Sequence, residues 1–449
     1  MELPKENVDE DALDQENDID VKDLKKNIRN FALKTIVEYN IKTFTDTNDI
    51  MIYTEGQYVK GEKILQGMFD TEFASYSTGS NFNEFLHFIR SSSFLDRELF
   101  ISPDNYINLK NCVLDAFTGK IYDHSPNYNF LYKIDTDYDK DAKCPEIERF
   151  LHSVISEKDY DCLIELIGNT FISGMYFRNL FVLVGTGSNG KSKFMKLIEK
   201  LVGKVNCSNI SMQSLSDDKF ASSSLYGKKV NICADIPSTS INETGVLKQL
   251  TGGDTLMAQQ KGKNAYFFVN EAKPIFSCNE LPDIKDKTTA MWERIILIEF
   301  PNEFKGKNED KDLLLKITTS SELSGLLNIA LVGVKRLLTN KTFSYDFDET
   351  MIRWYDYRNA RNPLILFIRE CIVLDDDKDL SMSDTFQLYK AYCKTMRVVS
   401  VSDKMFHIYM RRYLNQEDEY QPSDGHGKQI RSYKGIRVSD KWIKEYKLC

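Results

Sequence analysis

The chain has 449 residues, which is long enough for two to four domains of about 100–200 residues each. Its hydrophobic fraction of 42% and charged fraction of 28% are those of a soluble globular protein. The formal net charge of −8 excludes a protein that coats nucleic acid over its whole surface, but it leaves open DNA held in a local basic channel.

No apolar run approaches the roughly 20 residues that cross a bilayer, and the first residues do not form a signal peptide. The nine cysteines are scattered without a C-x-x-C pair, and the five histidines show no metal-ligand spacing. We therefore expect an intracellular, cytoplasmic protein with reduced thiols, no membrane contact, no zinc site and no disulfide framework.

Acidic residues gather at the amino terminus. Residues 1–23 hold ten Asp and Glu against two Lys, a net charge of 2 − 10 = −8. This segment alone equals the imbalance of the whole chain, so the remainder is close to neutral. Because it lacks the apolar content that would offset its ordering entropy, residues 1–21 are predicted to form a disordered acidic tail.

The part from 22 to 145 gives mixed signals and is predicted to be a small α+β domain. Helical periodicity comes first, and short strands are expected at 50–53 and 57–59. Alternating apolar positions over Tyr106–Lys120, with a Thr-Gly turn near their end, predict a hairpin.

A glycine-rich loop follows a predicted buried strand at Leu180–Val184. Its G-x-x-x-x-G-K-S spacing is typical of a phosphate-binding loop, whose backbone N–H groups point at phosphate oxygens. Lys191 supplies a charge for the β- and γ-phosphates, and Ser192 supplies a hydroxyl ligand for Mg²⁺. The alternative is an ordinary glycine turn between strand and helix. The predicted ATP-binding residues are Gly185, Thr186, Gly187, Ser188, Asn189, Gly190, Lys191 and Ser192.

Three further strands are predicted after the loop, at 228–235, 273–278 and 295–300. Asp235 ends the first, where a P-loop enzyme holds its Mg²⁺ or its attacking water, although such an Asp is also a common turn former or helix cap. Asn279 follows the second, where its amide could orient water against the γ-phosphate. Strands that alternate with helical stretches predict an α/β fold with a parallel sheet, which binds ligands beyond the carboxyl ends of its strands.

The motifs, in this order, resemble the superfamily 3 helicases, and within them the helicase part of phage, plasmid and poxvirus-type primase-helicases. The resemblance covers roughly residues 45–305 and, more loosely, the C-terminus. Besides the loop and Asp235, the segments that carry it are Leu247–Asp254, Gln260–Lys263, Ile275–Pro282 and Trp292–Pro301, with Ile107–Asp115, His124–Pro126 and Asp141–Pro145 upstream.

The resemblance implies an AAA+-type P-loop ATPase that forms a ring, usually a hexamer, with ATP between subunits and single-stranded DNA through the centre. It implies that Lys191 and Ser192 bind phosphates and Mg²⁺, and that Asp235 is the Walker B acid and a further Mg²⁺ ligand. Asn279 matches the sensor asparagine. Arg294 matches the arginine finger, which reaches the γ-phosphate of the neighbouring subunit.

Lys261 and Lys263 flank a glycine on what would be the pore hairpin, where they would bind DNA phosphates. The alternative for them is a solvated hairpin tip. Two positions depart from the family pattern. Asp235 is followed by Ile-Pro and not by a second acid, and a Glu precedes Arg294 where many relatives have paired arginines.

After the sheet, helical periodicity at 312–338 is consistent with a lid, so residues 146–345 are expected to form the ATPase domain with a helical entry and lid. Residues 346–449 are expected to form a winged-helix DNA-binding domain similar to the C-terminal domain of the same branch. Its predicted elements are helices at 362–372, at 383–394 and from Ser402 onward, and a hairpin at 429–438.

Arg411 and Arg412 lie on the third of these helices, where basic side chains are positioned for DNA phosphates. From Lys404 onward ten Lys and Arg oppose six Asp and Glu, 10 − 6 = +4, the reverse of the amino-terminal tail. The alternative is a winged helix that makes protein contacts.

The sequence therefore favours an ATP-driven replicative DNA helicase of a virus, phage or plasmid replicon, with ATP and Mg²⁺ as cofactors. Its expected partners are copies of itself in a hexamer, single-stranded and forked DNA, and a separate primase or polymerase, since the chain shows no paired-aspartate primase site and no zinc motif before the ATPase. An alternative is a DNA-binding replication or assembly factor that uses ATP to switch states without unwinding. A small-molecule kinase is disfavoured by Arg294, the lysine hairpin and the additional domains.

Overall fold

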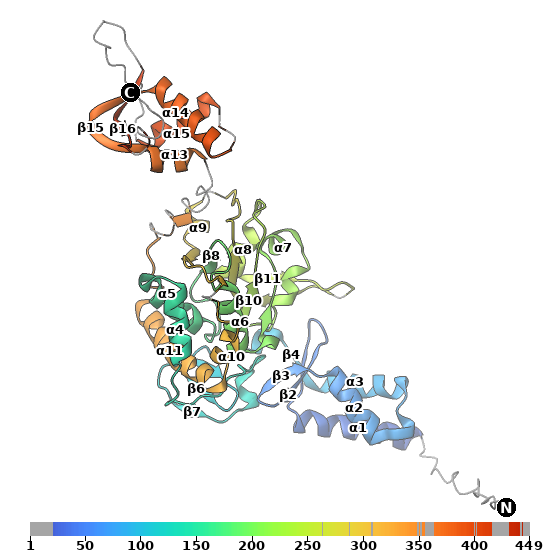
Figure 1. Cartoon of the computed structure of the whole chain (residues 1–449). Coiled ribbons are helices and arrows are strands. Elements are labelled where there is room, and N and C mark those ends of the chain that lie inside the picture. The colour runs from blue at the N-terminus through green and yellow to red at the C-terminus, as the bar shows by residue number, and fades with distance from the viewer. Residues whose placement is uncertain are drawn as a thin grey trace, which may run out of the picture. The chain divides into compact units, whose positions relative to one another are not determined.

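The computed structural model describes residues 21–262, 264–286, 288–306, 309–347, 350, 353–354, 363–398, 400, 402–414, 431–440 and 442. They divide into two compact units, of which the first ends at Tyr345 and the second begins at Asp346 (Figure 1). The predicted acidic tail lies outside the described residues, except for Val21, which begins the first helix. No helix in the described ranges is long and apolar enough to cross a membrane.

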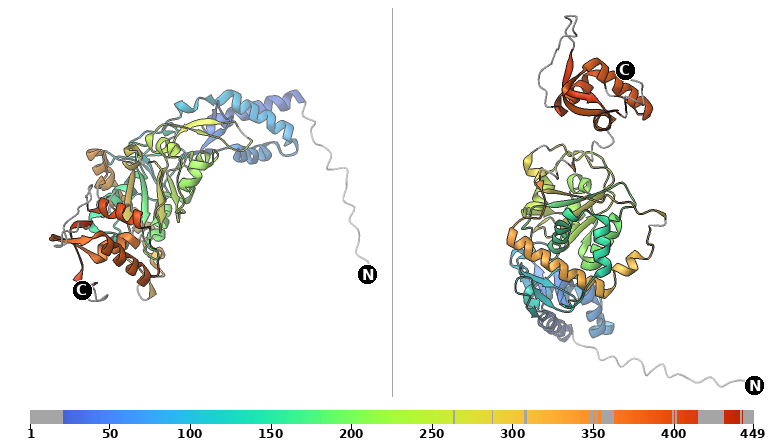
Figure 2. Two further views of the ribbon diagram at one scale, coloured as in Figure 1. Left: turned by 90° about the horizontal axis from the view of Figure 1, so that it is seen from above. Right: turned by 60° about the vertical axis from the view of Figure 1, so that its left-hand side comes forward.

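The amino-terminal part of the first unit combines three helices with a four-stranded sheet of order β3-β2-β1-β4. The strands predicted at 50–53 and 57–59 are confirmed as β2 and β3. Figure 2 shows the helices, in blue, at one end of the unit. The elements are α1 (Val21–Glu38), β1 (Lys42–Phe44), β2 (Ile50–Thr54), β3 (Gln57–Lys60), α2 (Glu62–Phe73), α3 (Gly79–Ser93) and β4 (Phe94–Leu95).

A three-stranded antiparallel sheet follows, formed by β5 (Tyr106–Asn108), β6 (Val113–Asp115) and β7 (Ile121–Tyr122). The predicted Thr-Gly turn lies between β6 and β7, where the side chain of Asp115 accepts hydrogen bonds from two turn amides. The hairpin expected over Tyr106–Lys120 is therefore the larger part of a three-stranded meander.

The centre of the first unit is a five-stranded sheet of order β14-β8-β13-β10-β9, in which every neighbouring pair is parallel. This confirms the predicted α/β fold with a parallel sheet, and adds the short edge strand β9. All residues of β8 and β13 are buried, as expected for strands covered on both faces. The strands are β8 (Leu180–Val184), β9 (Cys207–Ser208), β10 (Val230–Cys233), β13 (Lys273–Cys278) and β14 (Ile295–Glu299).

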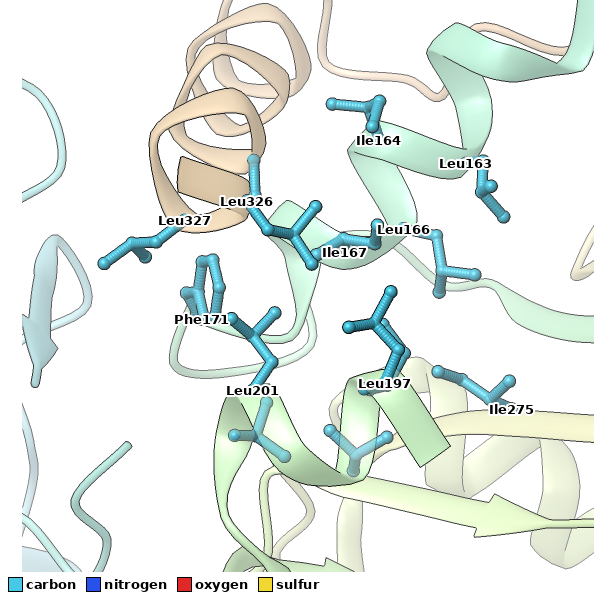
Figure 3. Close-up of a cluster of buried hydrophobic side chains, with 14 of the residues drawn as sticks. Leu163, Ile164, Leu166, Ile167, Phe171, Leu197, Leu201, Ile275, Leu326 and Leu327 are labelled. Carbon is cyan, nitrogen blue, oxygen red and sulfur yellow. The ribbon is translucent and has the colours of Figure 1, made fainter. Parts of the chain in front are cut away.

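Helices pack against this sheet and against one another around one large apolar cluster. In Figure 3, Ile167 of α5, Leu197 of α6, Leu326 of α11 and Ile275 of β13 converge on it. The helices predicted before the loop and at 312–338 are confirmed, each region forming two helices. The helices are α4 (Pro145–Val154), α5 (Glu157–Asn169), α6 (Lys191–Val202), α10 (Leu313–Ile317) and α11 (Ser320–Asn340).

A separate two-stranded antiparallel hairpin precedes β13, formed by β11 (Thr255–Ala258) and β12 (Tyr266–Val269). Helix α8 (Gly245–Gly252) leads into it. The first unit also contains two short α-helices, α7 (Met212–Asp217) and α9 (Thr289–Trp292), and several single-turn 3-10 helices.

The second unit contains helices and a two-stranded antiparallel sheet around its own aromatic core. Helices α13, α14 and α15 confirm the three helices predicted there. The elements are α13 (Pro363–Cys371), β15 (Ile372–Ser381), α14 (Met382–Thr395), α15 (Asp403–Tyr413) and β16 (Ser432–Val438).

The hairpin predicted at 429–438 is wrong. Residues Ser432–Val438 form a single strand, which pairs with β15 and not with itself. Gly435 has φ of 75° and lies where the register shifts between Leu374 and Asp379. It therefore accommodates a bulge in the strand pair, which is a common use of a glycine within a strand.

Candidate nucleotide-binding site

The glycine-rich loop joins the carboxyl end of β8 to the first turn of α6. Gly187, Ser188 and Gly190 have positive φ values of 109°, 51° and 91°. A Cβ atom on Gly190 would lie 2.6 Å from Val154 of α4, so only glycine fits there. The loop is thus shaped to place backbone N–H groups at a helix N-terminus, an arrangement that suits a chain of phosphates.

Lys191 is 4% exposed and its ammonium group lies within this loop. Nζ donates to the carbonyl oxygen of Gly185 at 2.8 Å, to Oδ1 of Asn189 at 3.0 Å and to Oδ1 of Asn279 at 3.2 Å. Burial lowers the pKa of Lys191, although Cys278 and Asp235 act in the opposite direction. A buried cation with neutral hydrogen-bond partners is ready to compensate phosphate charge.

Asp235 and Asn279 follow the carboxyl ends of neighbouring strands β10 and β13. Asp235 has φ of 51°, and its N–H donates to Oγ of Ser277 at 3.4 Å. Both side chains are exposed and line the same cleft as Lys191 and Ser192. The structure therefore brings four of the predicted site residues together from three separate segments.

The cleft has a volume of about 640 Å³. One wall is the loop with Asp235 and Asn279, as expected from the sequence. A second wall comes from α4 and from residues 304–306 and 309–316, neither of which was predicted from the sequence to belong to the site. The backbone N–H of Phe304 donates to the carbonyl oxygen of Ser188 at 2.7 Å and attaches this segment to the loop. The wall residues include Arg149, Phe150, Val154, Phe304, Leu313 and Lys316.

The wall combines apolar and basic side chains. Phe150 and Val154 come from the buried face of α4, and Leu313 from the start of α10. Lys316 pairs with Asp310 at 2.6 Å at the same side of the cleft. A pocket with an apolar side and a loop of backbone N–H groups suits a ligand that has both a planar base and phosphates.

Ser192 and Asp235 are the residues that could hold Mg²⁺. One hydroxyl and one carboxylate oxygen are hard ligands of the kind Mg²⁺ prefers, and it takes its remaining ligands from water and phosphate. Among the described residues, no group of three or more His, Cys, Asp and Glu side chains forms a metal site by itself. The donor set therefore fits an ion that arrives with a nucleotide.

Arg294 does not line this cleft. It immediately precedes β14, whose first residue pairs with the first residue of β8, and its carbonyl oxygen accepts a hydrogen bond from Leu180 N–H at 2.7 Å. The loop begins five residues later at the far end of β8, about 16 Å away at ~3.3 Å per residue. The Nε of Arg294 donates to Oγ1 of Thr251 at 3.1 Å. Arg294 thus lies at the amino ends of the strands, whereas the loop of the same chain lies at their carboxyl ends.

The predicted DNA-binding residues fall in two places. Lys261 is exposed at the turn between β11 and β12, next to Gly262, and Lys263 lies outside the described residues. Arg411 belongs to the second unit and is half-buried, with its Nε 3.4 Å from the carbonyl oxygen of His407. The backbone of Arg412 continues α15, while its side chain is outside the described part of the chain.

Two family profiles match the chain. Residues 17–156 match the family described as "D5 N terminal like", and residues 183–294 match a family of unknown function (DUF5906). The second match includes the whole loop, Asp235, Asn279 and Arg294.

Several viral proteins are similar in sequence. The chain is 34% identical over 221 residues to "Putative helicase L207/L206" of Acanthamoeba polyphaga mimivirus, covering 45% of this chain and 22% of that protein. It is 26% identical over 239 residues to "Putative helicase 121R" of Invertebrate iridescent virus 3, covering 47% and 25%. For "Putative helicase 022R" of Frog virus 3 (isolate Goorha), identity is 30% over 251 residues, covering 49% and 25%. The matched part spans about a quarter of each relative's length.

Among solved structures, the apo structure of the NrS-1 C terminal region (305–718) aligns with a TM-score of 0.47 and 12% sequence identity. The alignment covers 93% of this chain and 100% of that chain.

Proposed function

We propose that the chain is an ATP-driven replicative DNA helicase of a viral replicon, of the primase-helicase type. Its similarity to viral proteins named putative helicases and the match to the "D5 N terminal like" family support this proposal. The chain acts as a homo-hexameric ring that translocates on single-stranded DNA and unwinds duplex. The observation that carries the proposal is the convergence of Lys191, Ser192, Asp235 and Asn279 on one cleft beyond the carboxyl ends of parallel strands.

In this proposal the first unit contains a P-loop ATPase of the AAA+ type. The loop N–H groups and Lys191 bind the phosphates of ATP, and Ser192 and Asp235 hold Mg²⁺. The bound Mg²⁺ neutralises charge that develops on the phosphates during hydrolysis. Strand β13 lies between β8 and β10, so Asn279 stands between the loop and Asp235. Its side chain, already within hydrogen-bond distance of Lys191 at 3.2 Å, orients the attacking water.

The place of Arg294 supports the proposed ring. Because Arg294 lies at the amino ends of the strands and the loop at their carboxyl ends, the guanidinium does not reach the γ-phosphate that its own subunit binds. A head-to-tail ring that sets the amino ends of these strands in one subunit against the cleft of the next would supply the arginine in trans. Burial and the nearby Arg178 lower the pKa of Arg294, which is consistent with a cation held ready for an anionic partner.

DNA contacts are assigned to two elements. The hairpin tip with Lys261 and Lys263 contacts the phosphates of single-stranded DNA in the centre of the ring. The second unit acts as a winged helix, in which Arg411 and Arg412 of α15 contact forked or duplex DNA. Priming and synthesis are left to a separate primase or polymerase.

The test of the proposed function is ATP hydrolysis by the purified chain with and without single-stranded DNA. We expect Mg²⁺-dependent hydrolysis that rises when single-stranded oligonucleotide is added. If the rate of hydrolysis does not change when nucleic acid is added, the proposed translocation on DNA is contradicted. If the chain does not bind nucleotide, the proposed ATPase activity is contradicted.

A double change at the hairpin tip tests the DNA contact. Lys261→Ala/Lys263→Ala should weaken binding of all single-stranded sequences. It should also flatten the salt dependence of affinity, because a protein that neutralises fewer DNA phosphates releases fewer counterions on binding. Strand displacement should stop while basal ATP hydrolysis persists. The measurement is a salt titration of binding to a fluorescent oligonucleotide.

The matched control is Lys200→Ala/Lys335→Ala, which removes the same charge from exposed positions on α6 and α11. It should leave the slope of the salt titration unchanged. If the hairpin variant also keeps the unmodified slope and displaces strands normally, its lysines are not in the DNA path.

A further inference from the structure

The β11–β12 hairpin has two different faces. Leu256, Ala258, Tyr266 and Phe268 are buried, whereas the alternate residues Met257, Phe267 and Val269 are 52–61% exposed. The buried face packs on Tyr226, whose ring centre lies 5.6 Å from that of Tyr266 and 5.4 Å from that of Phe268. One face of the hairpin is therefore fixed by aromatic packing, and Tyr226 is the centre of that packing.

An arginine of the amino-terminal α+β part extends this packing. Arg97 follows β4, and its guanidinium carbon lies 4.8 Å from the ring centres of both Tyr226 and Tyr266. It lies 4.1 Å from the ring of Phe44 in β1, and the side chain is 10% exposed. The guanidinium thus stands between the amino-terminal sheet and the hairpin, in contact with aromatic rings from both. Tyr266 pairs with Ala258, the last pair before the turn, so the contact lies at the end of the two strands next to the hairpin tip.

Asp46 and Thr47 fix the orientation of this guanidinium. Its Nε and Nη2 donate to the two carboxylate oxygens of Asp46 at 2.7 and 2.9 Å, and Nη2 donates to Oγ1 of Thr47 at 3.0 Å. Burial alone would raise the pKa of Asp46, but the hydrogen bonds and charge of Arg97 lower it, so the pair is ionised at neutral pH. A forked ion pair of this kind holds a planar group in one plane, which a lysine cannot do.

The hairpin is connected in sequence to both parts of the candidate ATPase site. Thr251, which accepts the hydrogen bond from Arg294, lies at the end of α8, just before β11. Strand β12 leads through three residues into β13, which ends immediately before Asn279. The hairpin is therefore a close neighbour in sequence of the residue that binds Arg294 on one side and of the strand that ends before Asn279 on the other.

We propose that Arg97 is a positioning residue that anchors the hairpin to the amino-terminal domain at the end of its strands next to the tip, so that DNA bound at the tip moves the strands leading to Asn279. Without this anchor the hairpin would tilt on its own base, and DNA binding would not be transmitted to the ATP site. The anchoring contact stands by itself, and only its effect on DNA response rests on the proposed function.

The first measurement is hydrogen–deuterium exchange of the hairpin amides, which needs neither ATP nor DNA. In Arg97→Ala, and in Tyr266→Leu on the other side of the contact, exchange over 255–258 and 266–269 should rise by about tenfold through local opening. Arg97→Lys should restore little of the protection from exchange, because an ammonium group lacks the planar fork of a guanidinium. Arg90→Ala is the matched control: it removes an arginine of the same domain, paired with Glu62 at 3.8 Å, that makes no contact with the hairpin in the described structure.

The second measurement is the ratio of DNA-stimulated to basal ATP hydrolysis. We expect Arg97→Ala and Arg97→Lys to keep basal hydrolysis and lose most of the stimulation, which general loss of structure would not produce. Hairpin exchange that is unchanged in both Arg97→Ala and Tyr266→Leu would overturn the proposal, as would full stimulation in Arg97→Ala. If the unmodified chain does not respond to DNA, the proposed function fails, and exchange still decides whether Arg97 holds the hairpin.

Discussion

Replacement of Lys191 by alanine is expected to abolish ATP hydrolysis, with a loss of at least about a thousandfold in kcat. The substitution removes the positive charge that stabilises the negative charge developing on the phosphates in the transition state. The ammonium contacts Gly185, Asn189 and Asn279, so its loss also frees the sensor side chain. The fold should remain, because burial disfavours this charge in the folded chain.

The measurement is phosphate release at saturating ATP, together with thermal unfolding to show that the variant is folded. Lys196→Ala is the matched control, since Lys196 lies on the same helix but is 59% exposed and pairs with Glu199 at 2.7 Å. It should hydrolyse ATP like the unmodified chain. Undiminished turnover in Lys191→Ala would overturn the assignment of the loop.

Mixed rings should recover activity from two inactive variants. Arg294→Ala and Asp235→Ala should each be inactive alone, because the first lacks the group supplied to a neighbour and the second lacks its own Mg²⁺ ligand. In an equal random mixture, about a quarter of the head-to-tail interfaces combine an intact cleft with an intact Arg294. Hydrolysis should therefore return to roughly a quarter of the unmodified rate.

The control mixture is Asp235→Ala with Lys191→Ala. Both changes lie in the same cleft, so every subunit carries a damaged site and no interface can recover. No recovery in verified mixed rings of the first pair would count against a shared site. Recovery in both mixtures would mean that Asp235 or Lys191 also acts on the site of a neighbouring subunit.

The sequence was most informative where structure is local. Strand β8 begins and ends where its apolar run does, and the glycines after it require a sharp loop before α6. The same holds for β13, which was predicted at 273–278 and spans Lys273–Cys278. Because parallel strands share one carboxyl edge, the meeting of Asp235 and Asn279 also followed from the strand pattern.

The sequence was least informative where distant segments meet. The second wall of the cleft joins α4 to residues 304–306 and 309–316, and nothing in these segments shows that they face the loop. Arg97 gave no signal at all, since its aromatic partners come from three places in the chain. Contacts between remote segments depend on how the elements pack, which periodicity does not encode.

The second unit shows how charge conceals a strand. Strand β15 contains a run of three aspartates from Asp375 to Asp377, which no alternating apolar pattern accompanies. Its partner β16 was therefore assigned to a hairpin with itself. The pairing is stabilised by Arg437, which contacts Asp375 at 3.1 Å across the two strands.

The most direct test of the helicase assignment is strand displacement on a forked DNA with one labelled strand. The unmodified chain should release the strand in the presence of ATP and Mg²⁺, and it should fail with a non-hydrolysable analogue. Lys191→Ala and Lys261→Ala/Lys263→Ala should release nothing. DNA-stimulated ATP hydrolysis without displacement, on forks with either free single-stranded end, would contradict the account and favour an ATP-switched assembly factor.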